Sequence, residues 1–402
     1  MSSARRLLPL VIPALLVGVG SSVVLIVLST LAGWLQGYLW QVDSPWWTVL
    51  MLTLVGAATG LVVWKVPGHG GPDPATQDLI SPPDPMSALP SLALVTVLTL
   101  AGGVSLGPEN PITAINIALA VGLGSRLMPR AGAPLWLGMA ASGTIGALFG
   151  TPVAAALALS EAPIGDPKVP LWDKLFLPLI AAGAGSATTM ALSGEELSLP
   201  VPAYPGFHTF DLLTGAIITT VAAGLGLLAV YAFPHVHRFF HRIGNPVLMV
   251  AAGGLVLGLL GVLGGRITLF KGLHESKELL QGGHSAGQLA LILVIKLVAL
   301  VVAGTCGFRG GRIFPMIFAG VALGMLANTL FPAIPLSLAV MGGVLGFVLA
   351  ITQQGWLSLF SAVLIVGQAP LITLACVMIL PAWLLVSGKP QMIVKEEVSP
   401  AP

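Results

Sequence analysis

A single acidic residue, Glu109, stands inside a long apolar stretch and is the strongest candidate for chemistry in this chain. It is the only charged residue between Leu89 and Arg126. A charged side chain at the centre of a bilayer costs about 2.5–3.5 kcal/mol on insertion scales, and it is tolerated where it is paired, lines a watery path or faces a backbone dipole. We therefore expect Glu109 to lie on a path for ions or protons.

The residues after Glu109 predict such a dipole. Asn110 is a favourable helix N-cap, Pro111 suits the first helical position, and residues 112–127 continue as an apolar helix. This helix would begin inside the membrane, where its free N–H groups and the positive end of its dipole attract anions. Our hypothesis is that Glu109 and a permeant anion compete for that position.

The composition indicates a protein that lies mostly in lipid. Of the 402 residues, 56% are hydrophobic and only 8% are charged, and the mean hydropathy is +0.97, whereas soluble domains carry about 25% charged residues. We expect about ten or more membrane segments. The 50 glycines fit close helix contacts, and the 32 prolines indicate short or broken helices. The net charge of +2 is uninformative about nucleic acid, but the chain has no basic patch with interleaved aromatic residues, so we expect no nucleic-acid partner.

The N-terminal stretch predicts a retained first span. Arg5 and Arg6 precede an apolar run over residues 7–40, which is much longer than the core of a signal peptide. The two arginines favour a cytoplasmic N-terminus, since positive residues accumulate on that side.

The two halves of the chain repeat one pattern. Each has a span, a Gly/Pro break with one or two charges, an uncharged helix, a second break and another apolar run. Such matching interruptions are typical of inverted-repeat transporters with a site at the midplane. We predict an all-α polytopic fold with a first repeat at 1–195, a connector at 196–209, a second repeat at 210–388 and a polar tail at 389–402.

At these breaks the chain resembles the chloride channel/transporter (ClC) family over most of its length. Family members carry GSGIP, GK/REGP and GxFxP at three helix N-termini around the anion. The matching positions here read GHGGP at 68–72, GPENP at 107–111 and GRIFP at 311–315, and FGTP at 149–152 with Glu161 resembles the family's FNAP…EE stretch. The likeness is greatest to a bacterial branch of ion-transport proteins.

The resemblance implies a multi-pass protein of the bacterial inner membrane, built as a homodimer with one pathway in each subunit. It also implies that Glu109 is the gate of an anion pathway and that no cofactor or metal is needed. The other pathway residues that it implies are His69, Gly70, Gly71, Gly107, Pro108, Arg312, Ile313, Phe314 and Met392.

Several residues depart from the family pattern. His69 stands where the family has an anion-coordinating serine, and Met392 stands where a tyrosine closes the inner side. Ala162 replaces the second, internal glutamate that carries protons in antiporters. In the third break the phenylalanine is shifted by one position, so Arg312 and Ile313 are predicted to supply the backbone amides.

These departures leave the transported ion and the coupling open. Chloride is the default partner, fluoride or nitrate are alternatives, and the family includes voltage-gated channels as well as anion/proton antiporters. A carrier of another ion or small solute is the nearest rival, although helix N-termini favour anions over cations.

An intramembrane hydrolase built on Ser142 is the rival from another class. It needs a histidine base within hydrogen-bond reach. We predict no enzyme, because all the histidines fall in stretches expected to be polar connectors. They are His69, His208, His235, His237, His241, His274 and His284.

The other charged residues within apolar stretches have structural as well as functional interpretations. Arg309 and Arg312 either anchor a membrane end or raise the anion concentration in a vestibule. Lys296 is expected to snorkel or to pair with an acid such as Glu161, and Glu161 itself is expected to be structural.

The histidine and cysteine residues predict no metal site. His235 and His237 are expected on a solvated basic loop with no third ligand for a metal ion. Cys306 and Cys376 lie in apolar context and are expected to fill the core.

Overall fold

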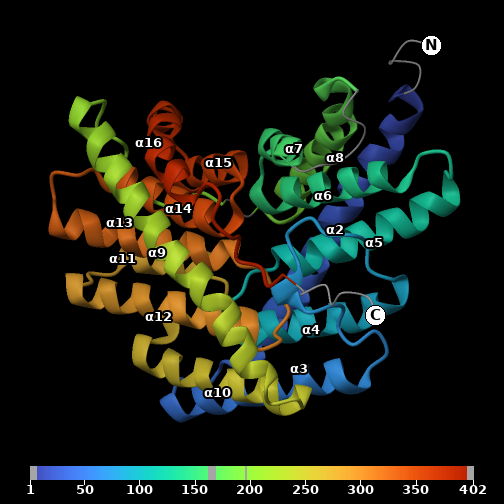
Figure 1. Cartoon of the computed structure of the whole chain (residues 1–402), viewed down its shortest axis with the longest axis horizontal. Helices are drawn as coiled ribbons and strands as arrows, with labels where there is room; N and C mark the ends of the chain where they lie inside the picture. The colour runs from blue at the N-terminus through green and yellow to red at the C-terminus, as the bar shows by residue number, and fades with distance from the viewer. Residues whose placement is uncertain (1–6, 162–168, 195–196, 396–402) are drawn as a thin grey trace.

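The computed structural model describes residues 7–161, 169–194 and 197–395, and every regular element in these ranges is a helix (Figure 1). The first half contains α2 (Val11–Leu39), α3 (Pro45–Lys65), α4 (Leu89–Ala101), α5 (Glu109–Leu127), α6 (Ala133–Phe149), α7 (Pro152–Glu161) and α8 (Leu171–Leu192). The second half contains α9 (Thr209–His241), α10 (Pro246–Gly264), α11 (Leu273–Gln281), α12 (Ala286–Thr305), α13 (Ile313–Leu330), α14 (Leu336–Thr352), α15 (Gly355–Val366) and α16 (Leu371–Val386). Short 3-10 turns are η1 (Leu8–Leu10), η2 (Pro74–Thr76), η3 (Met86–Ala88) and η4 (Arg266–Thr268).

The helices fall into two length classes. Within the described ranges, 7 are long and apolar enough to cross a membrane, and a further group of apolar helices, including α6, α7, α14, α15 and α16, has only 10–17 residues. Helices of that length are at or below the lower limit of about 17 residues that a hydrocarbon core of about 30 Å requires. This mixture agrees with the broken and short helices predicted from the prolines.

The two halves repeat one packing arrangement. In the first half α2 packs on α6 and α8, while α5 packs on α6; in the second half α9 packs on α14 and α16, while α13 packs on α14. Figure 1 shows the first half, in blue and green, beside the second half, in yellow to red. The predicted all-helical fold with two repeats is therefore confirmed.

Glycines bring the two halves close together where α3 crosses α10, helices that lie side by side in Figure 1. Gly56 and Gly60 are one turn apart on α3, and Gly254 and Gly258 are one turn apart on α10. A Cβ at Gly56 would lie 2.5 Å from a backbone oxygen of α10, and one at Gly258 would lie 2.6 Å from a backbone Cα of α3. Only residues without a side chain allow this approach, as in other membrane helix pairs.

One local prediction was wrong. The stretch from His235 to His241, expected to be a basic loop, continues α9 past Pro234. Basic residues in the last turn of a helix interact favourably with its dipole, which supports this extension.

Lys296 neither snorkels nor pairs with Glu161, so that prediction was also wrong. Its side chain is fully buried on α12, and its Nζ donates to the carbonyl oxygens of Thr268, Leu269 and Phe270 at 3.1, 3.1 and 2.9 Å. These carbonyls belong to the irregular segment between α10 and α11. The lysine thus satisfies backbone oxygens that would otherwise be buried without partners.

Replacing Lys296 with Met is expected to lower the free energy of unfolding by about 2 kcal/mol or more, because three buried carbonyls lose their donor. The melting temperature of the purified protein in detergent measures this effect. Lys65→Met, at the exposed end of α3, is the control. Equal melting temperatures for Lys296→Met and the wild type would contradict the assignment.

Candidate functional site

The second and third Gly/Pro breaks meet directly. The backbone N–H of Gly107 donates to the carbonyl of Gly311 at 2.8 Å, and the N–H of Gly311 donates back at 2.7 Å. Glu109 and Ile313 are 204 residues apart in the chain, and Gly107 and Gly311 have the same separation. The two breaks therefore occupy equivalent positions in the two repeats.

A helix begins at each break, and neither first turn is capped by its own N-cap side chain. Helix α5 begins at Glu109 with Pro108 as the N-cap, so the prediction that Asn110 caps it was wrong. Pro111 is tolerated because first-turn N–H groups have no intrahelical partner. Helix α13 begins at Ile313 with Arg312 as the N-cap.

The side chain of Glu109 crosses from α5 to the start of α13. Its Oε1 accepts hydrogen bonds from the backbone N–H of Ile313 at 2.6 Å and of Phe314 at 3.4 Å. The predicted donors at this break were Arg312 and Ile313, so the structure places the pair one residue later. Among the described residues, no group hydrogen-bonds to Oε2, although the side chain is fully buried.

Two glycines leave the space that this carboxyl group fills. A Cβ built on Gly107 would overlap Oε2 of Glu109, and one built on Gly311 would overlap its Cδ and Cγ atoms. Glycine is therefore required at both positions for the carboxylate to reach α13.

The residues on either side of Glu109 line different cavities. Pro108 lines a cavity of about 510 Å³ together with Phe149 and Phe314, whose rings stack at 5.5 Å. Asn110 lines a cavity of about 40 Å³ that Arg309 also lines. Glu109, whose side chain is fully buried, lines neither of these two cavities.

The first break does not bring a side chain to Glu109. Its residues 68–71 all have positive φ, and the backbone N–H of Gly70 donates to the Ser91 hydroxyl at 3.1 Å. His69 is exposed, and its Nδ1 lies 2.9 Å from the carbonyl oxygen of Val63. No α-helix begins directly after this break, because η2 follows it.

Arg309 ties the first break to the third. Its Nε donates to the carbonyl of Gly70 at 2.8 Å, its Nη1 to that of Gly307 at 2.8 Å, and its Nη2 to those of Gly71 and His69 at 3.1 and 3.3 Å. The guanidinium is buried rather than placed at a membrane end. The prediction of an anchor at the membrane surface was therefore wrong for this residue.

Arg312 holds the C-terminal segment beside the same site. Its guanidinium donates to the carbonyls of Gln77 and Met392. Met392 is buried, and its N–H donates to the carbonyl of Ile351 at 3.2 Å. The red segment that returns to the centre in Figure 1 is this part of the chain, and within it residues 391–394 are buried or half-buried.

Glu161 and Ser142 have local structural partners. Oε1 of Glu161 accepts a hydrogen bond from the N–H of Trp356 at 2.9 Å, at the start of α15. The hydroxyl of Ser142 donates to the carbonyl of Ala155 at 3.3 Å and is fully buried. Ala162, the predicted position of the missing second acid, lies outside the described residues.

Comparison with known proteins decides the family. A family model described as voltage gated chloride channel matches residues 76–386. The chain belongs to this family. It is also 49% identical, over 401 residues, to the protein named "Putative ion-transport protein YfeO" of Escherichia coli K12 (strain DH10B), with coverage of 97% of this chain and 96% of that protein. The same identity and coverage hold for the protein of that name from Escherichia fergusonii.

Solved structures share the fold. A CLC-type fluoride/proton antiporter superposes with a TM-score of 0.80 at 21% identity, covering 96% of this chain and 97% of the other. A slow cyanobacterial chloride/proton antiporter superposes with a TM-score of 0.78 at 15% identity, covering 97% and 96%. The predicted family and fold are confirmed, and the chain is a transport protein rather than an enzyme.

Gly311→Ala is expected to push the Glu109 carboxyl group off the start of α13, because the new methyl group overlaps it. A structure of the variant would show Glu109 beyond hydrogen-bond distance of the Ile313 N–H. Gly355→Ala is the matched control, since a Cβ there would lie 3.4 Å from the capping Glu161 carboxylate. An unmoved Glu109 in Gly311→Ala would contradict the geometry.

Proposed function

We propose that this chain moves small monovalent anions across the membrane along a path that Glu109 closes. The observation that carries the proposal is the bond from Ile313 N–H to Oε1 of Glu109. Free backbone N–H groups at a helix N-terminus bind anions, and here a carboxylate of the protein occupies them. An anion that enters must replace Glu109 at this position.

Protonation of Glu109 would open the path. A neutral carboxyl group is a weaker acceptor for the α13 amides than a carboxylate, so it leaves them to the anion. Oε2 has no hydrogen-bond partner among the described residues, which leaves it available to take a proton. The amides of Ile313 and Phe314 then replace part of the hydration shell of the anion.

We infer that Glu109 is the outer carrier if protons are coupled to anion movement. Both antiporters that were compared above are named as proton-coupled. Ala162 removes the internal acid, so the inner proton step needs water or another group. A channel-like path without proton movement is the second candidate. Ala162 favours it, because alanine cannot carry a proton.

Chloride is the proposed anion, and fluoride and nitrate are the alternatives. We expect no direct contact between His69 and an anion at Glu109. The His69 ring is instead hydrogen-bonded to the carbonyl of Val63, near the C-terminal end of α3. Selectivity would then rest on the backbone amides and on the space that Phe149 and Phe314 leave. We also propose a homodimer in the bacterial inner membrane with a cytoplasmic N-terminus, as the family resemblance and Arg5 and Arg6 suggest.

Glu109→Gln is expected to reduce proton movement to below about a tenth of the wild-type rate, while anion efflux persists or rises, since the amide keeps the shape but carries no proton. Efflux of chloride, and separately of fluoride and of nitrate, from liposomes with external pH recorded measures both rates. Glu161→Gln, which alters a capping carboxylate at another helix, should leave both rates unchanged.

An active wild-type protein whose rates Glu109→Gln leaves unchanged would refute the gating role. Wild-type protein that is folded yet passes none of the three anions would refute anion transport itself. Efflux without proton movement in the wild type would select the channel-like candidate.

A further inference from the structure

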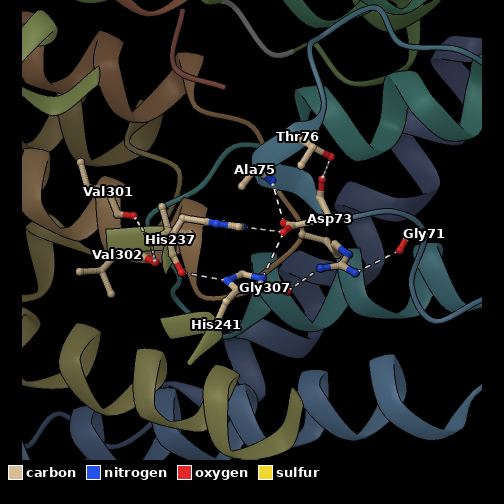
Figure 2. Close-up of polar contacts among 11 residues, drawn as sticks. Gly71, Asp73, Ala75, Thr76, His237, His241, Val301, Val302 and Gly307 are labelled. Carbon is tan, nitrogen blue, oxygen red and sulfur yellow. Dashed lines mark hydrogen bonds and ion pairs between the residues drawn. The ribbon is translucent and has the colours of Figure 1, made fainter. Parts of the chain in front are cut away.

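Three side chains outside the anion path converge on one point (Figure 2). Nε2 of His237 lies 2.7 Å from Oδ2 of Asp73, and Nε2 of His241 lies 3.2 Å from the same oxygen. The three ligand atoms lie within 4.8 Å of one another. The prediction that His237 lies on a solvated face without a third ligand was therefore wrong: its partner is 164 residues earlier in the chain.

Local backbone structure positions the three side chains. Asp73 directly follows the first break, and its Oδ1 accepts the N–H of Ala75 at 3.0 Å, which leaves Oδ2 for the histidines. His237 and His241 are one turn apart on α9, so both rings project from the same face. Their ring centroids are 3.7 Å apart.

The tautomer of His241 creates a need for a cation. Its Nδ1 lies 2.9 Å from the carbonyl oxygen of His237, and a carbonyl only accepts, so Nδ1 carries the hydrogen. A neutral ring then presents the lone pair of Nε2 to the Asp73 carboxylate. Two acceptors at 3.2 Å repel unless a proton or a metal ion lies between them.

We propose that Asp73, His237 and His241 bind one divalent transition-metal ion of the zinc class. Two imidazole nitrogens and one carboxylate oxygen form a common ligand set for such ions, at about 2.0–2.2 Å from the metal. The hydrogen bond from Nδ1 of His241 to a backbone carbonyl is the usual outer partner of a metal-binding histidine. The remaining ligand would be water from the adjoining cavity of about 250 Å³, which Asp73 and His241 line.

Arg309 also lines that cavity and carries a positive charge. Its N–H groups are directed to backbone carbonyls and not to Asp73, so the carboxylate stays free for a metal. Its positive charge weakens the binding of a cation, so moderate affinity is expected. Because Asp73 directly follows the first break, the ion would tie that break to α9 beside the path; this consequence alone rests on the proposed function.

Zn²⁺ titration of the purified full-length protein, without a histidine tag, tests the site by calorimetry. Wild type should bind one ion per chain, and His237→Gln and His241→Gln should each weaken binding about tenfold or more. His235→Gln is the matched control, because His235 lies on the same helix but is exposed and bonded to the carbonyl of Tyr231.

Absence of binding by the wild type, or equal binding by His237→Gln and His241→Gln, would overturn the proposal and leave a proton as the shared cation. Co²⁺ gives a second readout that needs no variant. Visible ligand-field bands that appear with one equivalent of Co²⁺ and disappear on adding Zn²⁺ support the site, and absence of the bands overturns it. Neither readout depends on anion transport. The metal-site proposal can therefore fail while the proposed function holds.

Discussion

One carboxylate that bridges two helix ends organises the centre of this protein. The carboxylate of Glu109, at the start of α5, accepts hydrogen bonds from the backbone N–H groups at the start of α13. Buried N–H groups need an acceptor, and in a membrane water is not available to supply it. The paired backbones of Gly107 and Gly311 hold the two ends together and leave the space for the carboxylate.

The buried cations satisfy backbone carbonyl oxygens, just as Glu109 satisfies backbone N–H groups. Broken helices leave carbonyl oxygens without partners, and each one costs free energy in a dry interior. Arg309, Arg312 and Lys296 all direct their N–H groups to such carbonyls. They thereby hold the first break, the C-terminal segment and the segment before α11 against the helices around the path.

Sequence reasoning could predict the features that depend on local signals. The isolated charge of Glu109, the Gly/Pro breaks and the repeated order of spans predicted the family, the two repeats and the central carboxylate. It failed where distant segments decide the structure. The return of Met392 to Arg312 and the contact of His237 with Asp73 join residues 80 and 164 positions apart, and Pro234 hid the last turns of α9 from a local reading.

Anion binding at equilibrium tests most directly whether Glu109 and the anion share one position. Chloride and fluoride would be titrated calorimetrically into the folded wild type and into Glu109→Ala at one pH. The competition predicts that the variant binds its anion about tenfold or more tightly than the wild type, which is about 1.4 kcal/mol. Equal or weaker binding by Glu109→Ala, with an unchanged melting temperature, would show that the carboxylate does not occupy the anion site.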